Sequence, residues 1–148
     1  MLILADPDAT TAAGALLAQS LRVGDVVALS GDLGAGKTSF ARGMLAALGL
    51  VEDAPSPSFA IIIPYAPPEV RLPLWHIDLY RIEKPEEIEE LGLDEARSEA
   101  ALVIEWPERM GPWLWSDALQ ISLENDESGG RRLTVVAPPS WEGRCPFQ

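Results

Sequence analysis

Cysteine, histidine and basic residues are all scarce in this chain of 148 residues, and each shortage excludes a class of protein. Cys145 is the single cysteine, which excludes an internal disulfide and a cysteine-based metal cluster. His76 is the single histidine, which excludes a zinc site built on several histidines. The 11 Lys and Arg residues against 23 Asp and Glu residues give a net charge of -12, which argues against a protein that binds nucleic acid through its phosphate backbone.

Long apolar runs are also missing. The longest run of small apolar residues, 12–18, falls far short of the ~20 residues that a membrane helix needs. No basic stretch precedes the first apolar residues, which argues against a secretory signal. We therefore expect a soluble, acidic, intracellular protein. Hydrophobic residues make up 47% of the 148, which is enough for one domain with its own core, spanning 1–148.

Hydrophobic patterning predicts an α/β fold with a mostly parallel central sheet and flanking helices. Strands are expected at 2–4, 26–29, 59–65, 72–80, 101–104, 118–123 and 132–137, the last two as an antiparallel C-terminal hairpin. Helices are expected after a capping Asp8, over about 37–48, and from Pro85 onward. Residues 138–148 are expected to be an irregular tail.

The strongest functional signal is a complete phosphate-binding loop, G-x-x-x-x-G-K-[ST], with the sequence Gly31-Asp32-Leu33-Gly34-Ala35-Gly36-Lys37-Thr38. Its glycines let backbone N–H groups wrap around phosphate, and the following helix adds its positive N-terminal end. Lys37 is expected to reach the β- and γ-phosphates, and Thr38 to ligate Mg²⁺. A chance match has a frequency on the order of one in a thousand at this composition. The predicted nucleotide contacts are Gly34, Ala35, Gly36, Lys37, Thr38 and Ser39.

A nucleotide-hydrolysing site also needs a carboxylate near the metal, usually at the end of a buried strand. Glu105 directly follows four apolar residues, and Asp78 ends the less continuously apolar stretch 74–77. Both would emerge at the edge of the sheet where the phosphate loop lies. We expect Glu105 to join Thr38 at the metal and Asp78 to play a supporting or water-orienting role, with the reverse assignment left open.

Three weaker signals surround this site. Ser56 and Ser58 lie in a proline-stiffened loop where a segment that senses the γ-phosphate would be placed, although an ordinary turn has the same composition. Trp106 follows Glu105 and is either a nucleotide contact or a core residue. His76 fits a structural role in its strand better than a catalytic one.

Taken together, these segments resemble one small family, the bacterial ATPase of tRNA threonylcarbamoyladenosine biosynthesis (TsaE, formerly YjeE). Behind the phosphate loop the matching blocks are Arg42-Gly43, Ser56-Pro57-Ser58-Phe59, His76-Ile77-Asp78-Leu79-Tyr80-Arg81, Glu105-Trp106-Pro107-Glu108 and, more weakly, Gly130-Arg131. Ser39 and Ser58 replace threonines of the family pattern and keep the hydroxyl. The tail from Pro138 matches nothing in the family.

The resemblance implies a P-loop NTPase fold and a Mg²⁺-dependent ATPase in the cytoplasm, with ATP or ADP bound. Its catalytic residues would be Lys37, Asp78 and Glu105, with Trp106 and Arg131 as further nucleotide contacts. It also implies an accessory role in the threonylcarbamoyladenosine (t6A) modification at position 37 of tRNAs. The partners would be the transferase subunit TsaD and its paralogue TsaB, with no direct contact to tRNA.

Two other functions use the same loop. A small-molecule kinase would transfer phosphate to an acceptor, but its lid is usually rich in Arg, whereas the segment from Glu83 to Glu99 is acidic. A nucleotide-gated binding protein would bind ATP with negligible hydrolysis. Measurement of phosphate release distinguishes both from an ATPase.

Overall fold

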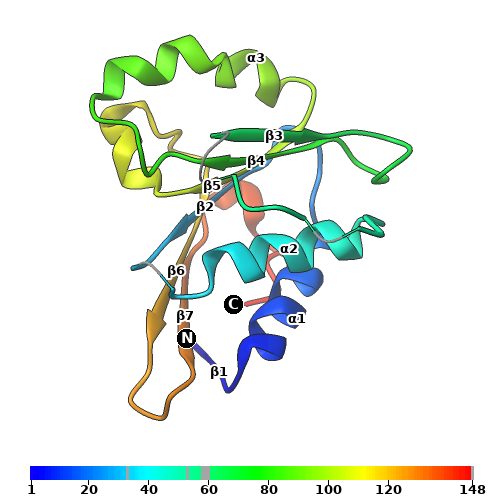
Figure 1. Cartoon of the computed structure of the whole chain (residues 1–148), viewed down its shortest axis with the longest axis vertical. Coiled ribbons are helices and arrows are strands. Elements are labelled where there is room, and N and C mark those ends of the chain that lie inside the picture. The colour runs from blue at the N-terminus through cyan, green and yellow to red at the C-terminus, as the bar shows by residue number, and fades with distance from the viewer. Residues whose placement is uncertain (33, 53, 58–60, 148) are drawn as a thin grey trace.

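A computed structural model of the chain describes residues 1–32, 34–52, 54–57 and 61–147. Within these residues, seven strands form one sheet in the spatial order β1-β7-β6-β2-β5-β4-β3 (Figure 1). The strands are β1 (Leu2–Leu4), β2 (Val26–Ser30), β3 (Ile62–Tyr65), β4 (Leu74–Asp78), β5 (Ala101–Glu105), β6 (Leu119–Asn125) and β7 (Arg131–Val136).

The four strands at the centre of the sheet, β6, β2, β5 and β4, run parallel to one another. Strand β3 is antiparallel to β4, and β7 is antiparallel to both β6 and β1. The expectation of a mostly parallel sheet is only partly right, because the sheet is mixed. The connection 66–73 between β3 and β4, for example, is too short for the crossover that a parallel pair needs. The predicted C-terminal hairpin is confirmed as β6 and β7.

Helical segments cover both faces of the sheet and create two cores (Figure 1). They are α1 (Pro7–Ala18), α2 (Lys37–Ala47), α3 (Leu93–Arg97) and the 3₁₀ helices η1 (Pro85–Leu91), η2 (Pro107–Trp113) and η3 (Pro139–Trp141). Val103 points toward α1 and α2, whereas its neighbour Ile104 belongs to the core under η1, α3 and η2. Among the described residues, none of the helices is long and apolar enough to cross a membrane.

Two glycines allow α1 and α2 to cross in backbone contact. A Cβ atom on Gly14 of α1 would lie 2.0 Å from the carbonyl oxygen of Phe40. A Cβ atom on Gly43 of α2 would likewise lie 2.0 Å from the carbonyl oxygen of Thr11. The close crossing brings the first turns of α1 beside the phosphate-binding loop, where they line the same cavity.

The structure corrects two features of the predicted helices. Asp6, and not Asp8, caps α1, because its Oδ1 accepts a hydrogen bond from the backbone N–H of Ala9 at 2.8 Å. The segment after Pro85 begins as a 3₁₀ helix and becomes α-helical only in the short α3. Gly92 separates the two in a left-handed conformation, with φ of 67°, which a continuous helix does not permit.

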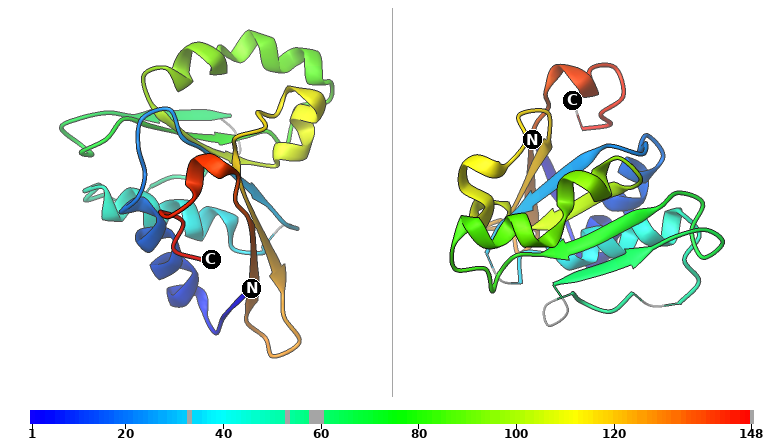
Figure 2. Two further views of the ribbon diagram at one scale, coloured as in Figure 1. Left: turned by 180° about the vertical axis from the view of Figure 1, so that it is seen from behind. Right: turned by 90° about the horizontal axis from the view of Figure 1, so that it is seen from above.

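The C-terminal tail is more ordered than the sequence predicts. Trp141 of η3 is 1% exposed, and Arg144 forms an ion pair with Asp25 at 2.6 Å. The ring centroid of Phe147 lies 6.2 Å from that of Phe40 in α2. Figure 2 shows this segment, in red, lying beside α1 when the molecule is seen from behind. The tail therefore adds to the core on the α1 and α2 side of the sheet.

Candidate functional site

The phosphate-binding loop connects the end of β2 to the start of α2, at the carboxyl edge of the parallel strands. Gly36 precedes α2 in a left-handed conformation, with φ of 101°, and a Cβ atom on Gly31 would lie 2.2 Å from the carbonyl oxygen of Leu123. Both positions therefore require glycine. The first N–H groups of α2 have no partner within the helix and carry its positive dipole, which suits an anion.

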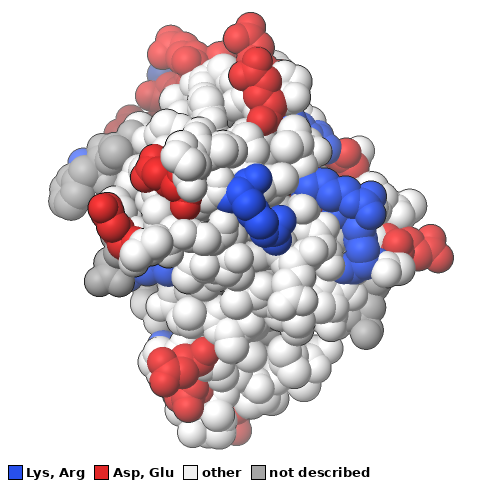
Figure 3. All heavy atoms as spheres, turned by 90° about the vertical axis from the view of Figure 1, so that its right-hand side faces the viewer, with Lys and Arg blue, Asp and Glu red and all other residues white. Residues whose placement is uncertain are grey.

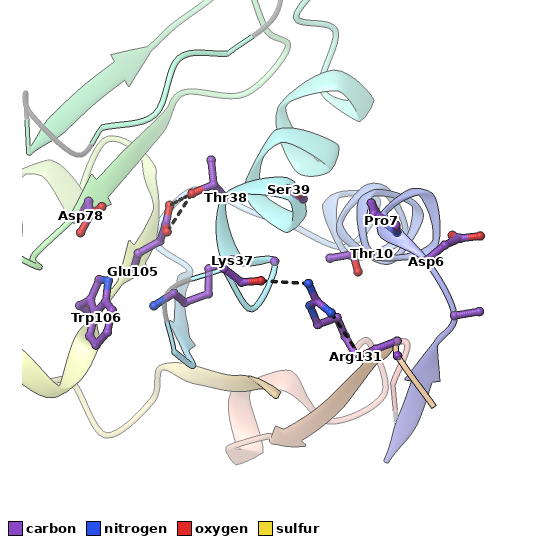
Figure 4. Close-up of a pocket in the computed structure, with 15 residues that line it drawn as sticks. Asp6, Pro7, Thr10, Lys37, Thr38, Ser39, Asp78, Glu105, Trp106 and Arg131 are labelled. Carbon is purple, nitrogen blue, oxygen red and sulfur yellow. Dashed lines mark hydrogen bonds between the residues drawn. The ribbon is translucent and has the colours of Figure 1, made fainter. Parts of the chain in front are cut away.

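Lys37 is buried at the start of α2, with 5% of its surface exposed. Its ammonium nitrogen donates to the carbonyl oxygen of Gly31 at 2.5 Å and lies 3.5 Å from the ring centroid of Trp106. Burial lowers the pKa of Lys37, while the charges of Glu105 and Glu108 act in the opposite direction. The side chain is thus held inside the cavity next to the phosphate-binding loop (Figure 4).

Glu105, at the end of β5, is in direct contact with Thr38 in the first turn of α2. The Thr38 hydroxyl donates to Glu105 Oε1 at 3.1 Å and to Oε2 at 3.2 Å. Glu105 is 3% exposed. The two residues expected at the metal therefore lie together, 67 positions apart in the chain.

Asp78 ends β4 directly beside Glu105 in the parallel pair. Its Oδ1 accepts a hydrogen bond from the backbone N–H of Tyr80 at 2.9 Å, and it is 6% exposed. Burial raises the pKa of Asp78 and the neighbouring Glu105 carboxylate adds to the increase, against the lowering by the Tyr80 hydrogen bond. Two carboxylates thus converge at one end of the cavity, close to Lys37.

Trp106 lines the cavity on the side of the carboxylates (Figure 4). Its backbone is left-handed, with φ of 61°, which is uncommon for a bulky residue and is found mainly at functional sites. Its ring packs at 5.0 Å from the ring of Tyr80, and its open face meets the ammonium of Lys37. The ring also packs against the second core, and its role as a nucleotide contact stays a prediction.

His76 does not line the cavity but is in contact with Glu105, a contact that the sequence did not indicate. Its Nε2 lies 2.6 Å from Glu105 Oε2, and its side chain is fully buried. Its Nδ1 has no hydrogen-bond partner among the described residues. The prediction of a structural histidine missed this contact, because nothing in the local sequence reveals which strand lies beside β4.

The opposite end of the cavity is formed by α1, the phosphate-binding loop and the turn between β6 and β7 (Figure 4). Arg131 donates from Nη2 to the carbonyl oxygen of Gly34 at 3.0 Å and from Nε to that of Ala35 at 3.1 Å. Thr10 also lines this end, is 1% exposed, and has a hydroxyl without a hydrogen-bond partner in the described part of the chain. Arg131 therefore supports the loop and contributes to the cavity wall.

The cavity has a volume of about 400 Å³, within the usual range for small-molecule sites. Of the residues predicted from the sequence, it brings together Gly34, Gly36, Lys37, Thr38, Ser39, Asp78, Glu105, Trp106 and Arg131. Ala35 is buried behind the loop. Ser56 is exposed and is not part of the cavity lining, and Ser58 lies outside the described residues, so the switch assignment stays a prediction.

The donor set suits Mg²⁺ bound together with phosphates. Within the described ranges, no group of three or more His, Cys, Asp or Glu side chains is arranged to hold a metal by itself. Mg²⁺ typically takes one or two protein oxygens and completes its shell with water and substrate phosphates. The Thr38 hydroxyl and the Glu105 carboxylate, already in contact, offer such a pair.

Comparison with known proteins places this site in a family. The family model "Threonylcarbamoyl adenosine biosynthesis protein TsaE" matches residues 4–133. TsaE of Nostoc sp. is 37% identical over 140 residues, covering 91% of this chain and 84% of the relative. TsaE of Bacillus subtilis is 38% identical over 133 residues, covering 89% and 82%.

The fold agrees with this relationship. The crystal structure of YdiB from Bacillus subtilis matches with a TM-score of 0.75 at 34% identity, covering 89% of this chain and 80% of that one. The family model spans the phosphate-binding loop, both carboxylates and Arg131, so the motifs and the fold indicate the same relationship. The chain belongs to the TsaE family of tRNA threonylcarbamoyladenosine biosynthesis proteins.

Proposed function

We propose that the protein binds Mg·ATP in the cavity between α2, β5 and α1 and hydrolyses it slowly when alone. The observation that carries this proposal is the contact of Thr38 with Glu105 beside the buried Lys37. A hydroxyl and an ammonium at the start of a helix, next to a carboxylate at the end of a strand, form the set of groups that P-loop enzymes use on a triphosphate.

Each residue then has a distinct task. Lys37 would leave Gly31 to neutralise the β- and γ-phosphates, and the first N–H groups of α2 would bind phosphate oxygens. Thr38 and Glu105 would hold Mg²⁺, which supplies charge neutralisation on the phosphates. Asp78, with its raised pKa, would orient the attacking water. Arg131 hydrogen-bonds to the carbonyl oxygens of the loop, so it would keep the loop in its phosphate-binding shape.

Slow turnover follows from the charges at the reacting end of the cavity. Among the described residues that line the cavity, Lys37 is the basic residue at this end, whereas Asp78 and Glu105 are both carboxylates. Neutralisation of the transition-state charge would therefore be incomplete without a partner. We propose that the partner is the transferase heterodimer of TsaD and TsaB, and that ATP hydrolysis supports t6A modification without direct contact between this chain and tRNA.

The test is nucleotide binding by Lys37→Ala, with Lys84→Ala as the matched control. Lys84 is the second lysine of the chain and is exposed at the start of η1. Loss of a charged hydrogen bond to phosphate should weaken the binding of a fluorescent ADP analogue by at least about tenfold in Lys37→Ala. Lys84→Ala should bind like the parent. Equal affinity of Lys37→Ala and the parent would show that the nucleotide site lies elsewhere.

A further inference from the structure

His76 belongs to the same surface of the sheet as the two carboxylates. Side chains alternate along β4, so His76 and Asp78 point to the same face, while Ile77 points to the other. Asp78 pairs with Glu105 on the neighbouring strand β5. His76 is therefore the diagonal neighbour of Glu105, within reach of its side chain.

In the hydrogen bond between His76 and Glu105, the donor and the acceptor can be assigned. Glu105 accepts the Thr38 hydroxyl through both carboxylate oxygens, and His76 Nε2 lies 2.6 Å from Oε2. A carboxylate can accept but not donate, so the hydrogen in the second contact is on Nε2. The other ring nitrogen, Nδ1, has no hydrogen-bond partner among the described residues. The hydrogen bond to Glu105 is thus the one that the His76 side chain makes with the described residues.

We propose that His76 is a positioning residue that fixes the orientation of the Glu105 carboxylate toward the metal. The inference rests on the proposed Mg·ATP site and adds to it a specific support for one ligand. Glu105 is held from one side by a helix hydroxyl and from the other by an imidazole that is fully buried. Outer hydrogen bonds of this kind keep a ligand in one rotamer, and their loss typically weakens metal binding by about 10- to 100-fold.

A purely space-filling role is less consistent with the geometry. A buried histidine with one unsatisfied nitrogen is costly compared with an apolar side chain of similar size. His76 is fully buried and its register partners on the neighbouring strands are Ile63 and Val103, so an apolar residue would fill the space without that cost. The hydrogen bond to Glu105 is what distinguishes histidine here.

The experiment compares His76→Gln with His76→Asn. The amide nitrogen of Gln can reach the place of Nε2, whereas that of Asn reaches only the place of Nδ1, and both variants bury a neutral amide. Binding of a fluorescent, non-hydrolysable ATP analogue is measured in EDTA and during a Mg²⁺ titration. Thermal unfolding of each variant without nucleotide measures any general loss of stability.

We expect His76→Asn to lower the apparent Mg²⁺ affinity by at least about tenfold. His76→Gln should recover most of that loss, and both variants should bind the analogue in EDTA like the parent. An unchanged Mg²⁺ affinity in His76→Asn would overturn the positioning role, as would equal losses in both variants that extend to binding in EDTA. Absence of binding by the parent would instead overturn the proposed function and this inference together.

Discussion

The ionised form of the buried Asp78 is unfavourable in the folded protein without ligand. The stability of the protein should therefore depend on pH through this residue. Its pKa is raised, first by burial and then by Glu105, so over a window above its ordinary value of 3.8 the folded state binds more protons than the unfolded state. The contribution of Asp78 to the free energy of unfolding therefore falls as pH rises through that window. Asp78→Asn removes the charge and keeps the oxygen that accepts from Tyr80.

We expect Asp78→Asn to be more stable than the parent at pH 7 by about 1 kcal/mol, with the difference closing as pH falls toward the ordinary Asp pKa. Urea unfolding at a series of pH values measures this. Glu108→Gln is the control, since that carboxylate is exposed and its loss should change stability little. A stability difference that stays constant with pH would mean that Asp78 is not destabilised by its surroundings.

Residues with a chemical signature in their own segment could be predicted from the sequence. Glu105 was identified by the four apolar residues before it, and Lys37 and Thr38 by the loop motif. The contact of His76 with Glu105 could not be, since it spans 29 positions and depends on which strands are neighbours. The position of Thr10 at the cavity could not be predicted either, because it follows from the crossing of α1 over α2.

The close crossing of α1 and α2 predicts that a Gly→Ala substitution at the crossing lowers the stability of the protein. Helix propensity alone predicts the opposite effect. Alanine normally stabilises a helix interior by about 1 kcal/mol relative to glycine. In Gly43→Ala the added methyl would meet the carbonyl oxygen of Thr11 at 2.0 Å, so the two helices must separate. We expect this substitution to lower the free energy of unfolding by about 1–3 kcal/mol.

The reverse substitution on the exposed face of the same helix, Ala46→Gly, is the control and should cost about 1 kcal/mol through propensity alone. Urea unfolding of both variants decides the matter. If Gly43→Ala proved more stable than the parent, the close helix crossing would be incorrect.

Element types were predicted well where the pattern was long or strongly apolar. The strands at the centre and the helix after the phosphate-binding loop are confirmed. The direction of the edge strands was harder to predict. It depends on the length of the connection and on which strand lies alongside, and an apolar run in the sequence indicates neither. The ordered tail was missed because Phe147 packs against Phe40 and Arg144 pairs with Asp25, each more than a hundred positions away in the chain.

At the scale of the whole molecule, charge is distributed unevenly. The segment 83–99 carries eight carboxylates and two basic residues, and it forms η1 and α3 on the side of the sheet opposite to α1 and α2. Figure 3 shows one face of the molecule, with acidic residues at the top, the side of η1 and α3 in Figure 1, and basic residues gathered nearer the middle. An acidic surface of this kind is better suited to a basic protein partner than to a tRNA backbone.

The proposed function requires that this cavity hydrolyses ATP and that a partner protein supplies the charge that the cavity lacks. The most direct measurement is phosphate release from Mg·ATP by the parent and by Glu105→Ala, each with and without purified TsaD–TsaB heterodimer. Glu105→Ala keeps the phosphate-binding loop and Lys37, so it should retain much of its nucleotide affinity and serve as a folded, inactive control.

We expect slow release by the parent alone and an increase of at least about tenfold when the heterodimer is added. Glu105→Ala should show no release above background in either condition. Release by Glu105→Ala equal to that of the parent, or no release by the parent even with the heterodimer present, would show that this cavity is not the ATPase site.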